Sequence, residues 1–184
     1  MLKRSVNMYL YRVLRDFERP RHRGIRARNP NARYSISQHV EYGNKQLPAF
    51  SGTRYISCSS EYNVAYEFGL KAVRSGKCKS IRLCVLDRSG LEKDPFIRVF
   101  DLYKGPSAQK LSPKAKVYAK RYKEVVVEDF IPPCYVVDVK CFSFPNGNVG
   151  LSSRKSKEYL SSDSSIDDGL PKDDGKQILE EPRM

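Results

Sequence analysis

Three groups that could bind or act on a phosphorylated sugar lie, in order, on three short apolar stretches of the sequence. Arg12 lies within residues 9–14, Ser57 and Ser59 follow an apolar pair, and Glu124 opens a run of three valines. A forked guanidinium suits the oxygens of a pyrophosphate. Serine hydroxyls suit a ligand hydroxyl or a neighbouring carboxylate. A carboxylate beside three valines is costly to bury unless it has a function or a partner.

Arg12 has two interpretations. On a strand, Leu10, Arg12 and Leu14 share one face, so the charge projects to a side that is otherwise apolar. Such a charge must be paired or must line a cleft. The residues alone support a structural salt bridge and a pyrophosphate site equally.

The serines and the glutamate also have structural alternatives. Ser57 and Ser59 end a strand just before a helix, where Ser60 is suited to cap the helix. Taken alone, that position favours capping. For Glu124, the alternative is a surface ion pair with a neighbouring basic residue.

The elements that must position these groups are short strands and a few helices. Patterning predicts strands at residues 8–14, 53–57, 80–87, 96–102, 124–127 and 134–139, and helices at 35–42, 60–74 and 114–121. The arginine-rich residues 15–33 show no apolar period and predict a long loop, and residues 87–90 predict a turn. Many short strands with few helices predict an α+β fold.

Charge is concentrated in one part of the chain. The 184 residues carry a net charge of +13 and are 40% hydrophobic, which is typical of one folded domain. Residues 1–151 hold 28 Lys and Arg against 13 Asp and Glu. This excess favours a polyanionic partner such as nucleic acid over a generally basic surface. Residues 151–184 are rich in Ser, Asp, Lys and Gly and predict a disordered tail after a domain of residues 1–150.

Several classes of protein are disfavoured. No apolar stretch approaches the roughly 20 residues of a membrane span. The first residues lack the pattern of a secretory signal, so we expect an intracellular location. The five cysteines are odd in number and predict reduced thiols. Because His22 and His39 do not lie at metal-ligand spacing from any cysteine, we expect no metal site.

Together the three motifs resemble the cholera-toxin-like class of ADP-ribosyltransferases, whose signature is Arg, Ser-Thr-Ser and a catalytic Glu on three strands. Arg12 matches the arginine, Ser57-Cys58-Ser59 matches the triplet with Cys in the Thr position, and Glu124 matches the glutamate. Ile131-Pro132, after the valine strand, also fits. The resemblance covers residues 8–142. It implies split mixed β-sheets around an NAD cleft, with a few short helices.

The resemblance also implies roles. Glu124 is the expected catalytic residue, and Arg12, Ser57, Ser59 and Gly24 are expected to bind NAD as co-substrate. Glu128 is a second candidate for the catalytic acid. Tyr66, with Tyr62 and Phe68, is a candidate for stacking on nicotinamide, although we expect Phe68 to face the core. No membrane or obligate protein partner is expected, and the chain is expected to be a monomer.

Within this class, a small basic chain is similar to the shellfish enzymes that modify guanine in DNA, and more distantly to the pierisins. Pierisin-like members carry Gln two residues before the catalytic Glu, and arginine-modifying members carry Glu there. This chain has Tyr122, which argues against arginine modification. We expect Tyr122 to stack on a base and the neighbouring basic residues to contact DNA: Lys120, Arg121 and Lys123.

Two sets of alternatives stay open. An enzyme of the same fold could act on RNA, a free nucleotide or a protein, or could use water as acceptor and be an NAD glycohydrolase. From a different class, the chain could be a non-catalytic, basic nucleic-acid-binding protein. It lacks the motifs of the common nucleic-acid-binding folds, which argues against that interpretation.

Overall fold

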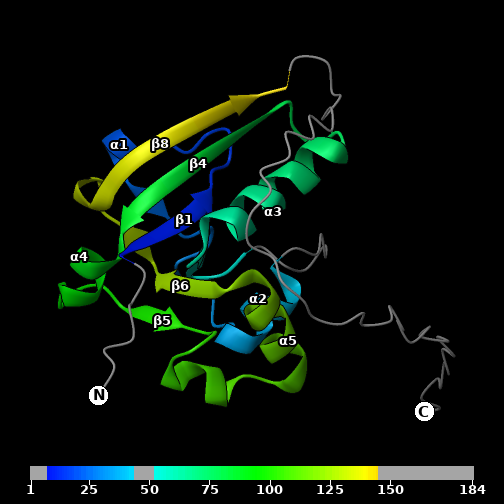
Figure 1. The fold of residues 1–184 in the computed structure, drawn as a ribbon. Coiled ribbons are helices and arrows are strands. Elements are labelled where there is room, and N and C mark those ends of the chain that lie inside the picture. The colour runs from blue at the N-terminus through cyan, green and yellow to red at the C-terminus, as the bar shows by residue number, and fades with distance from the viewer. Residues whose placement is uncertain (1–7, 44–51, 145–184) are drawn as a thin grey trace, which may run out of the picture. The chain divides into compact units, whose positions relative to one another are not determined.

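The computed structural model describes residues 8–43 and 52–144. The chain divides into two units, Met1–Gly150 and Leu151–Met184. The tail predicted at 151–184 lies outside the described residues. Within the first unit, the described residues form one large antiparallel sheet, a two-stranded ribbon and several short helices (Figure 1). The predicted α+β class is confirmed.

The large sheet brings the three motif strands together. Its strand order is β5-β6-β3-β1-β4-β8, so β3 lies between β6 and β1. The bounds are β1 Tyr9–Val13, β3 Tyr55–Ser59, β4 Ser80–Asp87, β5 Val99–Asp101, β6 Glu124–Glu128 and β8 Val136–Ser143. All neighbouring strands are antiparallel. Three segments that are far apart in the sequence therefore become neighbours.

The sheet is weakly joined between β1 and β3. These strands pair only at Tyr11 and Ser59, whereas β3 and β6 pair at five positions. Beside the single paired position, the Arg12 guanidinium donates a hydrogen bond to the Ser57 carbonyl. A side chain thus satisfies a carbonyl that would otherwise bond to a neighbouring strand.

The arginine-rich stretch is not a simple loop, as the sequence predicted. It contains α1, Pro20–Arg23, and β2, Ile25–Arg26, which pairs with β7, Phe130–Ile131. Ile25 and Ile131 are fully buried, and this long-range burial holds the short strands together. Gly24 has φ of +65°, and a Cβ there would lie 2.3 Å from the Ile131 carbonyl oxygen. Only glycine fits this approach.

Two helices begin where the sequence predicted. In α2, Ile36–Tyr42, Ser35 and Gln38 form a capping box. In α5, Pro113–Tyr122, Ser112 is the N-cap and Pro113 the first helical residue. At the other end of α5, Lys123 has φ of 49°, and this left-handed residue turns the chain directly into β6.

The helix α3, Tyr62–Arg74, differs from its prediction. Its N-cap is Glu61, and the Ser60 hydroxyl donates to the Lys123 carbonyl instead of capping. The prediction that Phe68 faces the core was also wrong, because its side chain is 39% exposed. The inward face is set by small side chains that allow close packing on the sheet: Gly69, for example, lies against Ile81. The buried residues are Ala65, Gly69, Leu70 and Val73.

The remaining elements complete the layers. The predicted turn at 87–90 is the start of α4, Arg88–Lys93, capped by the Asp87 side chain. Short 3-10 turns lie at Pro106–Lys110 and Pro133–Tyr135. Both faces of β6 are covered, since Val125 and Val127 pack with Leu10 and Val126 packs under α5. Glu124 therefore begins a strand with no solvent-facing side.

Candidate functional site

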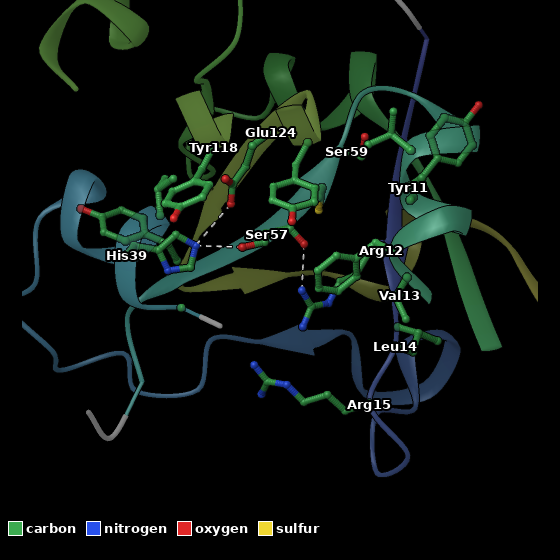
Figure 2. Close-up of a pocket in the computed structure, with 18 of the residues that line it drawn as sticks. Tyr11, Arg12, Val13, Leu14, Arg15, His39, Ser57, Ser59, Tyr118 and Glu124 are labelled. Carbon is green, nitrogen blue, oxygen red and sulfur yellow. Dashed lines mark hydrogen bonds and ion pairs between the residues drawn. The ribbon is translucent and has the colours of Figure 1, made fainter. Parts of the chain in front are cut away.

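A cleft with a cavity volume of about 540 Å³ opens where β1, β3 and β6 meet α2, α3 and α5. Arg12, Ser57, Ser59, Glu124 and Tyr122 all line it. Figure 2 shows side chains from these separate elements around one space. The structure thus brings together the main residues that the sequence singled out.

Arg12 forms the structural salt bridge that its sequence position allows, and it also lines the cleft. It is only 7% exposed, and its Nη2 atom forms an ion pair with Glu18 Oε1 at 2.9 Å. Its Nη1 atom donates to the Ser57 carbonyl at 2.8 Å (Figure 2). Its Nε is buried without a hydrogen-bond partner among the described residues. The guanidinium is therefore held at the cleft wall by an ion pair and a hydrogen bond.

Two further arginines line the same cleft. Arg15 follows β1 and Arg28 lies beyond β2. Burial lowers the pKa of Arg15, and the positive charge of Arg12 lowers it further. Neither Arg15 nor Arg28 has a carboxylate ion-pair partner in the described part of the chain. Arg12, Arg15 and Arg28 therefore carry three positive charges, and among the described residues only the carboxylate of Glu18 pairs with one of them. This side of the cleft has a net positive charge.

Glu124 is a buried carboxyl with an unusual pKa. It is 8% exposed, and burial raises its pKa from 4.5 to about 7. A hydrogen bond from the Ser57 side chain acts in the opposite direction and favours the ionised form. Near neutral pH, the side chain is therefore balanced between its protonated and ionised states.

His39 is a site residue that the sequence reasoning missed. From α2, its Nε2 lies 2.8 Å from Ser57 Oγ and 3.8 Å from Glu124 Oε1, and its Nδ1 lies 2.5 Å from Thr53 Oγ1. Burial, and then the charge of Arg12, lower the pKa of His39 to about 4. The ring is neutral at pH 7, so its approach to Glu124 is not an ion pair (Figure 2).

These contacts define a directed hydrogen-bond chain. Because Ser57 donates to Glu124, the Ser57 oxygen accepts from the Nε2–H of His39. A neutral imidazole then accepts at Nδ1, and Thr53 is the donor. The chain runs from Thr53 through His39 and Ser57 to Glu124, and it fixes the hydroxyl that supports the ionised carboxylate.

The position of His39 depends on how α2 packs. Ser37 accepts a hydrogen bond from the Ser112 backbone, and the Ser112 hydroxyl donates to Glu41, so α2 is tied to the start of α5. The sequence did carry a signal, since His39 shares the inward face of the predicted helix with Ile36 and Val40. The spacing between His39 and the cysteines, which was considered for metal binding, does not identify this role.

Aromatic side chains form the outer wall of the cleft. Phe68 and Tyr122 line it, with ring centroids 5.7 Å apart in an edge-on arrangement. Tyr118, one helical turn before Tyr122 on α5, lines it as well and was missed from the sequence. Of the three residues expected to stack on nicotinamide, only Phe68 lines this cleft.

Other predicted residues lie outside the cleft. Gly24 packs between α1 and the β2–β7 ribbon, and Tyr66 packs on Tyr62 and Phe142. Glu128 is held by Arg54 and Arg98 at 2.9 and 2.5 Å.

Ser59 lines the cleft but also accepts the Glu61 backbone N–H, so its hydroxyl is partly structural. Lys120 and Arg121 are exposed on α5, outside the cleft lining. The Lys123 ammonium lies over the Tyr103 ring at 4.0 Å. Lys120, Arg121 and Lys123, the residues expected to contact DNA, therefore lie next to the cleft but do not line it.

The described ranges contain no group of three His, Cys, Asp or Glu side chains suited to hold a metal ion. All five cysteines are free thiols, and burial raises the pKa of Cys58 and Cys84 to about 12. Among residues 8–43 and 52–144, no helix has the length and apolar character needed to cross a membrane.

No protein-family model and no curated protein matches this chain. Among solved structures, the chain is similar to one named EcPltA, with a TM-score of 0.51 and 13% sequence identity. The similarity covers 75% of this chain and 86% of that one. At this identity, the comparison shows a shared fold and nothing about activity.

Proposed function

We propose that this protein is a mono-ADP-ribosyltransferase that moves ADP-ribose from NAD to DNA and releases nicotinamide. The observation that carries the proposal is the convergence of Arg12, Ser57 and Glu124 in one cleft, from three strands that the sequence resemblance singles out. The buried, hydrogen-bonded state of Glu124 supports a catalytic role, because perturbed carboxyls gather at functional sites.

The charge of the cleft supports NAD as donor. Arg12, Arg15 and Arg28 line the cleft together, and their guanidiniums offer several donors to a pyrophosphate. The Ser57 hydroxyl and Glu124 lie at the other side of Arg12, suited to the hydroxyls of a ribose. In a bound dinucleotide, the arginines would therefore contact the phosphates, while Ser57 and Glu124 would contact the ribose.

The proposed reaction breaks the bond between the nicotinamide nitrogen and ribose C1′. The bonding electrons leave with nicotinamide, and positive charge develops on the sugar as in glycoside hydrolysis. Ionised Glu124 stabilises that charge, and this interaction is stronger in the transition state than in the ground state. The acceptor nitrogen then bonds to C1′ and loses a proton. The hydrogen bond from Ser57, which His39 orients, favours the ionised form of Glu124 that the step requires.

The acceptor is proposed to be the 2-amino group of guanine in DNA. The outer wall of the cleft holds Tyr118 and Tyr122, which suit stacking on an exposed base. The basic side chains of α5 border this wall and suit phosphate contacts. The absence of a carboxylate two residues before Glu124 supports a base over an arginine side chain.

The test is to incubate the protein with radiolabelled NAD and separate pools of DNA, RNA and protein, and to digest the labelled pool. Label on deoxyguanosine is the expected result. Label on RNA or protein would move the acceptor to another class. Nicotinamide release without label would identify an NAD glycohydrolase, and intact NAD in every pool would contradict the proposed activity.

A further inference from the structure

A second cavity, of about 320 Å³, lies at the start of β1 and α3. Three tyrosines line it, Tyr9, Tyr11 and Tyr62, and none of them belongs to the buried core. The other lining residues are Met8, Ser60, Glu61 and Asn63. The cavity therefore offers aromatic surface to solvent outside the proposed active site.

Two of the three tyrosine rings, those of Tyr11 and Tyr62, are held by ring contacts before any ligand binds. Tyr11 and Tyr62 meet edge to face at 5.6 Å, and Tyr62 stacks on Tyr66 with ring centroids 6.1 Å apart. Tyr66 is anchored in turn against Phe142. Tyr9 is 38% exposed at the rim. Rings held in this way lose little conformational entropy when a flat ligand stacks on them.

A lysine ammonium lies beside one of the aromatic rings that line the cavity. The Lys140 ammonium, from β8, lies 5.4 Å from the Tyr62 ring centroid. The Ser60 backbone donates to the Lys123 carbonyl at 2.9 Å, so the Lys123 backbone lies next to a lining residue. The Lys123 ammonium itself lies 4.0 Å from the Tyr103 ring centroid. Glu61 is the single acid in the lining.

The second cavity adjoins the main cleft. Tyr11 lines both cavities. Ser59 lines the main cleft, while the next residue, Ser60, lines the second cavity. A polymer with one unit in the main cleft can therefore reach the second cavity across Tyr11 and these two serines.

We propose that the second cavity is a subsite for an unpaired nucleobase that neighbours the modified one on a single nucleic-acid strand. Stacking platforms interleaved with cations are the chemistry by which single strands are bound. The proposal rests on the proposed function for the position of the modified base. The occupant is a nucleic-acid strand, and binding of an acidic peptide in its place is an outcome that the test distinguishes.

The test uses the full chain with the double substitution Tyr9→Ala and Lys140→Gln, both outside the main cleft. A matched control, Phe96→Ala with Lys77→Gln, also removes one exposed aromatic and one lysine, since Phe96 is 94% exposed and Lys77 lies past the far end of α3. Lys140→Gln alone changes only an exposed side chain and so tests the cationic side without altering β1.

Two readouts are compared. In activity, KM for a single-stranded oligodeoxynucleotide should rise about tenfold in the Tyr9→Ala, Lys140→Gln variant, in line with the loss of one base stack. Transfer to free deoxyguanosine and the control variant should not change. An unchanged KM for the oligonucleotide, or an equal loss with deoxyguanosine, would overturn the proposal.

In binding, fluorescence anisotropy of a labelled oligodeoxynucleotide should show about tenfold weaker affinity for the same double variant, and Lys140→Gln alone should show part of that loss. This readout needs no turnover, so it still tests the subsite if the parent protein leaves NAD intact. Equal affinities for parent and variant would refute the subsite, as would competition by polyglutamate as strong as that of unlabelled oligonucleotide.

Discussion

Burial shifts the pKa values of Glu124 and His39 toward the neutral form of each side chain. The pKa of Glu124 rises to about 7, whereas that of His39 falls to about 4. Near pH 6, both the Glu124 carboxyl and the His39 ring are therefore mostly uncharged. The proposed chemistry requires ionised Glu124, so turnover should increase as pH rises through about 7.

The same shifts predict opposite effects on stability. Between pH 4.5 and 7 the folded state holds the Glu124 proton more tightly than the unfolded state, so this group lowers stability as pH rises. His39 holds its proton less tightly when folded, so it adds stability as pH rises from 4 to 6.5. The two contributions oppose each other in the parent protein.

Glu124→Gln should therefore be more stable than the parent above pH 7. Each pKa unit corresponds to about 1.4 kcal/mol, so a rise from 4.5 to about 7 corresponds to about 3 kcal/mol. Urea unfolding of parent and variant at pH 5 and pH 8 measures the difference. A gain that is equal at both pH values would show that Glu124 is not the titrating group.

His39 should act by positioning Ser57. His39→Leu removes the donor to Ser57, and we expect about tenfold lower kcat and a pH profile whose acidic limb moves to higher pH, because the hydrogen bond that favours ionised Glu124 is weakened. His39→Gln supplies an amide donor in place of Nε2–H and should restore much of the activity. A profile that does not move in His39→Leu would leave the residue a merely structural role.

Substitutions of the cleft arginines should have two different effects, because Arg12 forms an ion pair whereas Arg15 and Arg28 form none among the described residues. Arg12→Gln leaves Glu18 buried and unpaired, which should cost about 3–5 kcal/mol in the free energy of unfolding. Arg15→Gln with Arg28→Gln breaks no described ion pair and should leave stability within about 0.5 kcal/mol while raising KM for NAD. A KM that stays at the parent value would remove both arginines from the pyrophosphate site.

At the scale of elements, α5 carries the proposed contact with DNA. Lys114, Lys116 and Lys120 are exposed on this helix, whose apolar residues pack on β6. Replacing all three with Gln should weaken DNA binding and reduce the slope of log K against log salt by about 0.7–0.9 for each DNA phosphate that the helix no longer neutralises. Replacing Lys77, Lys79 and Lys93, which are also exposed, is the matched control. An unchanged slope would place the interface elsewhere.

The sequence predicted those elements whose signals are local. The i, i+4 spacing of Ile36 and Val40, the Ser112-Pro113 pair that starts a helix, and the alternation around Arg12 identified α2, α5 and β1. What it missed depends on distant partners. The strand β2 exists because Ile25 meets Ile131 across the chain, and His39 matters because its helix packs on α5. The inward face of α3 was misread because Gly69 carries no hydrophobic signal yet allows the closest approach to the sheet.

At the scale of the whole molecule, the sheet order β6-β3-β1 makes one site of three weak motifs. Any one of Arg12, Ser57 or Glu124 has an ordinary structural explanation, and Arg12 indeed forms an ion pair. Their convergence beside an arginine-rich wall is the stronger observation. The net charge of +13 adds a long-range attraction for polyanions around that site.

Nicotinamide release from NAD in the presence of DNA tests the central claim most directly, with Glu124→Gln and Glu128→Gln compared with the parent at equal folded concentration. Both glutamates lie buried on β6, but only Glu124 faces the cleft. The account predicts a loss of about a hundredfold or more for Glu124→Gln, in the range found when one transition-state interaction is removed, and near-parental release for Glu128→Gln. Release at the parental rate by Glu124→Gln would contradict it.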